Sequence, residues 1–206
     1  MTKIKICGLT RIQDIEAVNK ALPDFIGFVF ASSRRQIDEN KAKILKDFLN
    51  PSIQTVGVFV NEEPEKIIRI CKNRIIDLIQ LHGNENETYV YELRKYVPNK
   101  IIKAVRVKSH QDIENALNFP CDYLLLDAYH EEKYGGIGRT FNWSFITGIS
   151  RSFFLAGGIN SSNVHRAIRC HKPYCIDVSS GAETNGYKDP EKIMEIVAMV
   201  RQADLL

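Results

Sequence analysis

The stretch Lys5-Ile6-Cys7-Gly8-Leu9-Thr10 indicates how the rest of the chain folds. Isoleucines at positions 4 and 6 alternate with lysines at 3 and 5, which is the period of a β-strand that ends at Cys7. Gly8 allows a turn or a close approach to a ligand, and Thr10 is the expected N-cap of a following helix. The segment therefore predicts a strand–loop–helix unit that carries a thiol into the loop. Taken alone, Cys7 also fits a small buried hydrophobic residue.

The same strand–helix alternation continues along the 206 residues. Strands are expected at residues 4–7, 25–30, 55–60, 75–81, 101–107, 123–127, 153–156 and 175–178. Helices are expected at residues 11–21, 39–49, from Pro64, 85–96, 110–118, near Trp143, from residue 161 or 162, and from Asp189-Pro190. Eight repeats predict a (β/α)8 TIM barrel, with residues 1–206 forming a single domain. A doubly wound sheet is the alternative, but no G-x-G-x-x-G follows the first strand, which disfavours its dinucleotide-binding form.

Composition narrows the class of protein. The chain is 44% hydrophobic, and 28 basic against 25 acidic residues give a net charge of +3, too mild to indicate a nucleic-acid or membrane partner. Five cysteines form no C-x-x-C pair, so neither a metal site nor a redox motif is expected. No apolar run approaches the length of a membrane span. We therefore expect a cytoplasmic protein with reduced thiols.

A barrel would gather the polar residues that follow its strands at one mouth, where enzymes of this fold place their active sites. The candidates, in chain order, are Cys7, Arg34, Arg35, Asn61, His82, Arg106, Asp127, Gly157-Gly158 and Ser179-Ser180-Gly181. Glycine-rich turns after the seventh and eighth strands favour a phosphate site, because backbone N–H groups and helix dipoles attract a dianion. Tight turns alone would also explain these glycines.

A thiol and a carboxylate at the same mouth, Cys7 and Asp127, indicate a general base and a general acid that move protons on a sugar phosphate. For these roles the acid would need its pKa raised by burial, and the Cys7 thiol would need its pKa lowered by a positive field in the site. Each of these residues also fits a purely structural role. Asp127 could cap a loop, and Arg35 could be a solvated surface charge. For His82 we favour the structural role, a hydrogen-bonded histidine. Packing is the favoured role of Trp143, and Asp177 is expected to be buried and paired.

Together these motifs resemble the phosphoribosylanthranilate isomerases of tryptophan biosynthesis, essentially from end to end. The resemblance is carried by Lys5–Thr10, Gly57–Asn61, Gln80–Gly83, Leu125–Asp127, Leu155–Gly158, Asn163-Val164, and Asp177–Gly181 with Glu183 and Lys188-Asp189. It implies a cofactor-free barrel enzyme that converts N-(5-phosphoribosyl)anthranilate to 1-(2-carboxyphenylamino)-1-deoxyribulose 5-phosphate by an Amadori rearrangement.

The resemblance also implies roles for individual residues. Cys7 matches the family's general base and Asp127 its general acid, while Arg35 matches the arginine that holds the anthranilate carboxylate. The phosphate is expected at Gly157-Gly158 and at Ser180-Gly181. The partner is thus a small phosphoribosyl substrate, and the chain is expected to be a monomer or a homodimer.

Three segments differ from the family's usual pattern. Ser33-Arg34-Arg35 replaces Ser-Pro-Arg, and Gly135–Gly138 carries isoleucine where the family has threonine; both bear on substrate affinity. In Phe141-Asn142-Trp143, asparagine replaces aspartate and still suits a helix cap.

Two rival functions are a sugar-phosphate isomerase that also serves histidine biosynthesis and a non-catalytic binder of phosphorylated ligands. The first uses paired aspartates, which Cys7 argues against. The second needs neither Cys7 nor Asp127.

Overall fold

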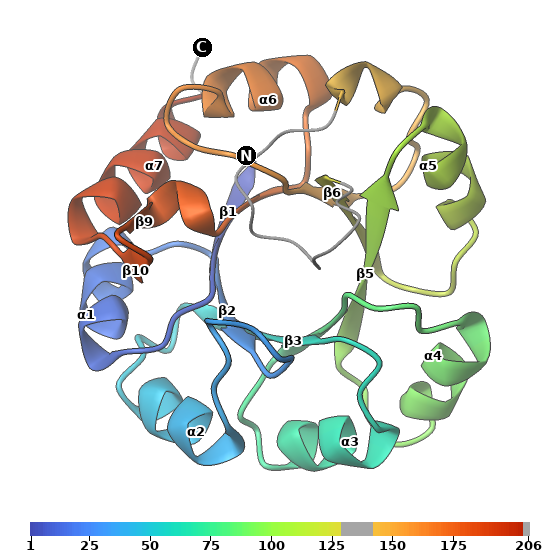
Figure 1. Ribbon diagram of the computed structural model, residues 1–206, viewed down its shortest axis with the longest axis horizontal. Coiled ribbons are helices and arrows are strands. Elements are labelled where there is room, and N and C mark those ends of the chain that lie inside the picture. Colours follow the sequence, from blue (N-terminus) through green and yellow to red (C-terminus); the bar gives the residue numbers. More distant parts are fainter. Residues whose placement is uncertain (129–141, 204–206) are drawn as a thin grey trace.

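Within residues 1–128 and 142–203, which the computed structural model describes, eight parallel strands close into a barrel in the order β1 to β8 (Figure 1). The strands are β1 (Lys3–Cys7), β2 (Phe25–Val29), β3 (Gln54–Phe59), β4 (Leu78–Leu81), β5 (Lys100–Val107), β6 (Tyr123–Ala128), β7 (Phe153–Leu155) and β8 (Cys175–Val178). The last strand pairs with the first, and this register places Lys5 opposite Asp177. The prediction of a (β/α)8 barrel is confirmed.

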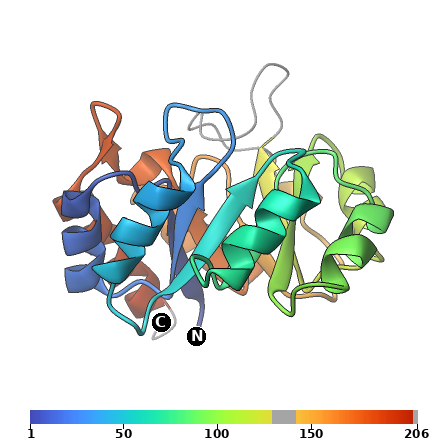
Figure 2. The same ribbon diagram turned by 90° about the horizontal axis from the view of Figure 1, so that it is seen from below.

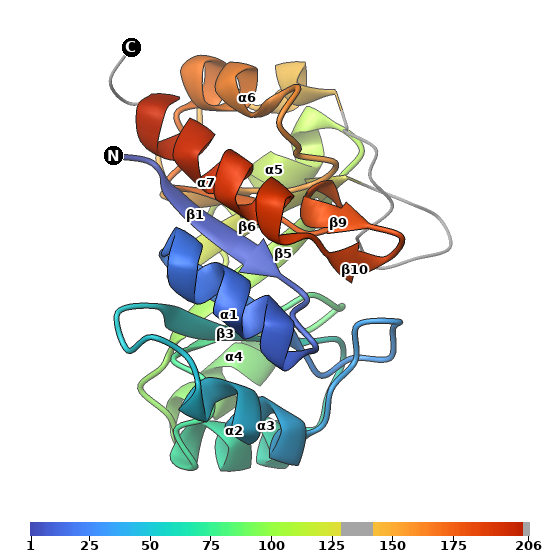
Figure 3. The ribbon, with the colours of Figure 1, turned by 90° about the vertical axis from the view of Figure 1, so that its left-hand side faces the viewer.

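Helices surround the barrel (Figure 1). They are α1 (Ile12–Ala21), α2 (Glu39–Asp47), α3 (Pro64–Lys72), α4 (Glu87–Arg94), α5 (His110–Ala116), α6 (Val164–His171) and α7 (Pro190–Ala203). Two short 3-10 helices, η1 (Trp143–Phe145) and η2 (Ser180–Ala182), and a hairpin of β9 (Glu183–Thr184) and β10 (Tyr187–Lys188) complete the described elements. Figure 3 shows β1 between α7 and α1, and α7 contacts both of them.

Two apolar cores follow from the alternation of side chains along each strand. Outward-facing residues such as Ile4 and Ile6 pack with helix residues such as Val18. Inward-facing residues such as Phe25 and Phe154 pack together inside the barrel. Because both faces of the strands are covered, strands such as β2 and β7 are continuous apolar runs in the sequence, whereas β1 carries the buried Lys5.

At the start of several helices, a side chain accepts hydrogen bonds from backbone N–H groups that have no partner within the helix. The predicted cap at Thr10 is wrong: the N-cap is Arg11, and the buried Asp14 carboxylate accepts hydrogen bonds from the backbone N–H groups of both Thr10 and Arg11. The predicted roles of Pro64 at the start of α3 and of Asn142 and Asp189 as caps are confirmed.

Most element boundaries differ from prediction by one or two residues, and two of the shifted starts have a clear local cause. The fourth strand begins at Leu78 and not at Ile75, because Arg74 adopts a left-handed conformation (φ 54°) and the Ile75 N–H still bonds back to the end of α3. The sixth α-helix begins at Val164, because Asn160 binds the Ser162 hydroxyl and backbone N–H in a preceding turn.

The C-terminal ends of the strands define one mouth of the barrel. In Figure 2 the blue loop after β2 and the red β9–β10 hairpin rise from the same end of the barrel, opposite the N-terminus. Residues 33–35 and 183–188, which are far apart in the sequence, therefore reach the same mouth.

Candidate active site

Cys7 ends β1 and is almost fully buried. Its strand partner is Gly27, and a Cβ atom on Gly27 would lie 2.6 Å from the Cys7 sulfur, so the sulfur fills space that only glycine leaves open. The next residue, Gly8, has φ +88°, and the Arg35 side chain lies where a Cβ atom on Gly8 would be. The two glycines thus allow the thiol and the arginine to come together.

Burial dominates the acidity of the Cys7 thiol and raises its pKa. The Lys5 ammonium acts against burial, Asp177 adds to it, and Lys188 acts against it more weakly. The lowered pKa that the base role of Cys7 would need is therefore not present in the free protein. The positive charges exist as expected, but the loss of water around the sulfur outweighs them.

A charged layer crosses the barrel below Cys7. The Lys5 ammonium is completely buried and donates to Asp177 Oδ2 and to Gln80 Oε1, each at 2.9 Å. Burial alone would lower the pKa of Lys5, but the Asp177 carboxylate and then Cys7 outweigh it and raise the pKa. The prediction that Asp177 is buried and paired is confirmed.

Asp127 lies near the end of β6 with its side chain buried. Its Oδ1 accepts the Ala128 N–H at 2.8 Å, and its Oδ2 lies 3.2 Å from Nε2 of His82. The other ring nitrogen of His82, Nδ1, is 2.8 Å from Gln80 Nε2. His82 is therefore hydrogen-bonded, as predicted, and also adjacent to the candidate acid.

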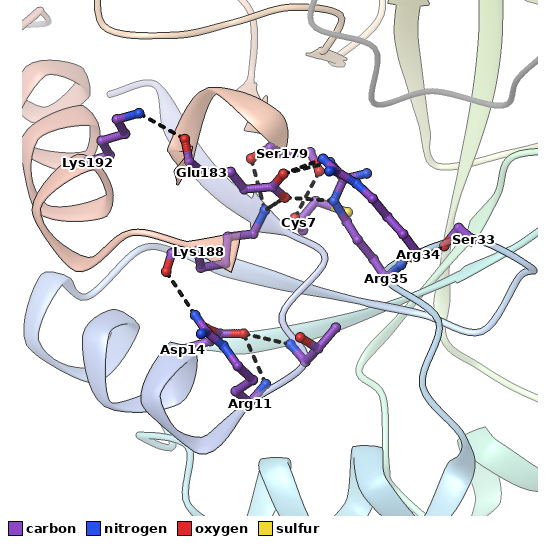
Figure 4. A network of polar contacts seen from close by, with 11 residues as sticks. Cys7, Arg11, Asp14, Ser33, Arg34, Arg35, Ser179, Glu183, Lys188 and Lys192 are labelled. Carbon is purple, nitrogen blue, oxygen red and sulfur yellow. Dashed lines mark hydrogen bonds and ion pairs between the residues drawn. The ribbon is translucent and has the colours of Figure 1, made fainter. Parts of the chain in front are cut away.

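At the mouth, the Glu183 carboxylate forms ion pairs with three cationic side chains (Figure 4). It accepts from Arg35 Nε at 2.7 Å, from Arg34 Nη2 at 2.6 Å and from Lys188 Nζ at 2.6 Å. Burial alone would raise the pKa of Glu183, but the Arg35 hydrogen bond and the charge of Lys188 lower it. Burial lowers the pKa of Lys188, against the pull of Glu183. The cluster therefore keeps an excess of positive charge beside Cys7.

The two predicted phosphate loops touch each other. Gly157 and Gly158 both have positive φ, and the side chains of Asn160 and Asn163 donate to the Gly158 carbonyl. A Cβ atom on Gly181 would overlap the Ile159 carbonyl, so the loop after β8 packs directly on the loop after β7. Ser180 begins η2 in the same segment.

The other candidates lie around this centre. Asn61 (φ 47°) and Arg106 both contact Asn84, at 2.7 and 2.6 Å. Trp143 is buried against His171 and Arg166, which agrees with its predicted packing role. Gly135–Gly138 and Phe141 lie outside the described residues.

Sequence reasoning missed the partners of the candidate residues. Glu183, which holds Arg35, was quoted only as part of a motif. Lys5 and Gln80, which connect the surroundings of Cys7 and Asp127, likewise stood only within motifs and were given no role of their own. A lysine at the centre of a buried strand was the available signal, because an ammonium there needs an acceptor.

Fold and mouth together define a (β/α)8-barrel enzyme whose site is built from ionisable side chains. Within the described residues, no group of three or more side chains suited to a metal lies together, and no helix is both long and apolar enough to cross a membrane.

Residues 4–199 match the family described as N-(5′-phosphoribosyl)anthranilate isomerase. The isomerase of Endomicrobium trichonymphae is 46% identical over 201 residues, covering 98% of this chain and 99% of that protein. The crystal structure of the Thermotoga maritima isomerase superposes with a TM-score of 0.87 at 37% identity, covering 100% of both chains. A second isomerase structure, with a TM-score of 0.85 at 35% identity and 100% coverage of both chains, holds reduced 1-(o-carboxyphenylamino)-1-deoxyribulose 5-phosphate. The chain belongs to this family, which acts in tryptophan biosynthesis.

Proposed function

We propose that the chain isomerises N-(5′-phosphoribosyl)anthranilate to 1-(2-carboxyphenylamino)-1-deoxyribulose 5-phosphate, with Cys7 as general base and Asp127 as general acid. The observation that carries this assignment is the placement of a thiol and a carboxylate near the C-terminal ends of β1 and β6, at one mouth of the barrel.

Asp127 begins the reaction by giving its proton to the furanose ring oxygen. The ring C–O bond breaks, and the electron pair on the anilino nitrogen forms a Schiff base. Negative charge then develops on Asp127, where the Ala128 N–H already donates to Oδ1 at 2.8 Å. A donor in place before charge develops lowers the cost of the proton transfer.

Cys7 then removes the C2′ proton and leaves an enolamine, which tautomerises to the ketone. The active form of the base is the thiolate, and burial disfavours that form in the free protein. Lys5 and Lys188 favour the thiolate. A bound substrate that excludes water would strengthen the effect of both charges on the sulfur.

Substrate anions fit the two charged regions of the mouth. Arg35 is oriented by Glu183 and is proposed to bind the anthranilate carboxylate. The phosphate is proposed to bind at Gly157, Gly158, Ser180 and Gly181, where two loops provide backbone N–H groups.

We further propose that residues 1–206 act as one domain in the cytoplasm, as a monomer or a homodimer. All five cysteines are free, as is usual in a reducing compartment. The Thermotoga maritima isomerase is described as dimeric, and monomers of it have been generated.

The test is turnover of freshly generated phosphoribosylanthranilate, followed by the loss of its fluorescence. Cys7→Ala and Asp127→Asn are each expected to lower kcat by at least ~10²-fold. The reduced product analogue is expected to bind both variants as it binds the wild type. Wild-type turnover in either variant would refute the role of that residue.

A further inference from the structure

The ring nitrogen Nε2 of His82 is buried and lies beside the candidate acid. It directly follows β4, and its side chain is 9% exposed. Its Nε2 lies 3.2 Å from Asp127 Oδ2, yet it makes no aligned hydrogen bond with any described residue. Catalytic hydrogen bonds in free enzymes are often poorly aligned and tighten when substrate binds.

The tautomer of His82 follows from a chain of hydrogen bonds that starts at Lys5. An ammonium has no acceptor, so the Gln80 atom that faces it must be the carbonyl oxygen. The Gln80 NH2 group must then face His82, and it can only donate to Nδ1. A neutral imidazole that accepts at Nδ1 carries its proton on Nε2, which is the nitrogen facing Asp127.

We propose that His82 is a positioning residue for Asp127, held in the donating Nε2–H tautomer by Lys5 through Gln80. This proposal rests on the function proposed above, in which Asp127 is the general acid. As Asp127 transfers its proton to the substrate, the His82 N–H donates to Oδ2 and the Ala128 N–H to Oδ1. His82 only donates this hydrogen bond, and no proton passes along the chain from Lys5 through Gln80 to His82.

This chain of hydrogen bonds gives Lys5 two effects on the reaction. Its charge favours the Cys7 thiolate, and its hydrogen bond to Gln80 orients the ring that aims Asp127. One buried ammonium, itself held by Asp177, thereby connects the base and the acid across the interior of the barrel.

Two replacements of His82 separate positioning from packing. His82→Asn keeps an acceptor near Nδ1 but removes the donor to Asp127. It is expected to lower kcat at least about tenfold, the value of one hydrogen bond to a charged group, with KM within about threefold. His82→Gln places an amide N–H near the position of Nε2 and is expected to restore kcat to within about threefold of wild type. A wild-type kcat in His82→Asn would overturn the proposal, as would an equal loss in both variants.

The isosteric change Gln80→Glu tests the tautomer directly. A carboxylate accepts from Lys5 and also from Nδ1–H, so the ring proton is expected to leave Nε2, and kcat is expected to fall at least about tenfold. Gln54→Glu makes the same chemical change at an exposed position at the other end of the barrel and is expected to keep wild-type kcat. In the His82→Gln background, Gln80→Glu is expected to cost less than in the wild type, because an amide has no tautomer to lose. The same cost in both backgrounds would assign the effect to the added charge and overturn the proposal.

Nitrogen NMR of histidine-labelled protein provides a readout that does not depend on turnover. The His82 signals, assigned by their loss in His82→Gln, are expected to show Nδ1 unprotonated in the wild type and protonated in Gln80→Glu. A protonated Nδ1 in the wild type refutes the proposed chain of hydrogen bonds from Lys5 to His82. Loss of turnover in Asp127→Asn together with wild-type kcat in His82→Asn refutes only the role of His82. Full turnover in Asp127→Asn refutes the proposed function, and the role of His82 with it.

Discussion

Replacing Gly27 with alanine is expected to disable the enzyme through the position of one sulfur atom. The new Cβ atom would lie 2.6 Å from the Cys7 sulfur, whereas ordinary contacts begin at 3.4 Å, so the sulfur has to move by at least about 0.8 Å. A misplacement of about 1 Å costs ~10²-fold in rate, and overpacking costs about 1–3 kcal/mol of stability. We therefore expect kcat to fall by ~10²-fold with KM nearly unchanged, and the midpoint of thermal unfolding to drop by several degrees.

Gly57→Ala is the matched control. Gly57 lies in β3, and its Cβ atom would meet Ile76 at 2.7 Å and Phe59 at 2.8 Å, a similar overlap away from the thiol. This variant is expected to lose similar stability but to keep kcat within about threefold of wild type. The two variants are compared by the fluorescence assay and by thermal unfolding. The reasoning fails if Gly27→Ala turns over like wild type, or if both variants lose turnover in proportion to stability.

Three further predictions concern stability and binding. Burial raises the pKa of the Cys71 thiol to about 12 from 9.0. The unfolded chain therefore loses this proton at a lower pH than the folded protein, and the contribution of the thiol to stability, complete below pH 9, is lost as the pH rises toward 12. Between pH 8 and 10.5, urea unfolding is expected to show the wild type losing about 2 kcal/mol more than Cys71→Ala, and equal losses would contradict this. Arg35→Met is expected to raise KM at least about tenfold, and Arg34→Met, at a 55% exposed side chain, less than threefold; the reverse order would remove Arg35 from the carboxylate site. Lys5→Met is expected to cost about 3–5 kcal/mol in urea unfolding because it leaves the Asp177 carboxylate buried without its cation, and Lys5→Met with Asp177→Leu is expected to recover most of that loss.

The barrel was predictable because its signals are local. Most strands contain a short apolar run, and Asn142 and Asp189 cap the elements that follow them directly. The error at Thr10 shows the limit of such signals, since Asp14 provides the cap from inside the helix. The β9–β10 hairpin was missed because strands of two residues are too short to show periodicity.

The partners in the site could not be predicted, because they depend on distances between residues far apart in the sequence. Arg35 and Glu183 are 148 residues apart, and nothing near Arg35 indicates which carboxylate it meets. The direction of the Cys7 pKa shift depends on burial weighed against two ammonium groups, and that balance requires coordinates. The tautomer of His82 follows only once Lys5, Gln80 and His82 are seen in line.

The pair formed by Lys5 and Asp177 joins residues separated by 172 positions, so it has a consequence for synthesis of the chain. Translation proceeds from the N-terminus, and the ammonium leaves the ribosome long before its carboxylate has been made. An unpaired ammonium is costly to bury. A nascent chain that has not reached β8 is therefore expected to leave β1 undocked, and the first strand takes its place only when the last strand arrives.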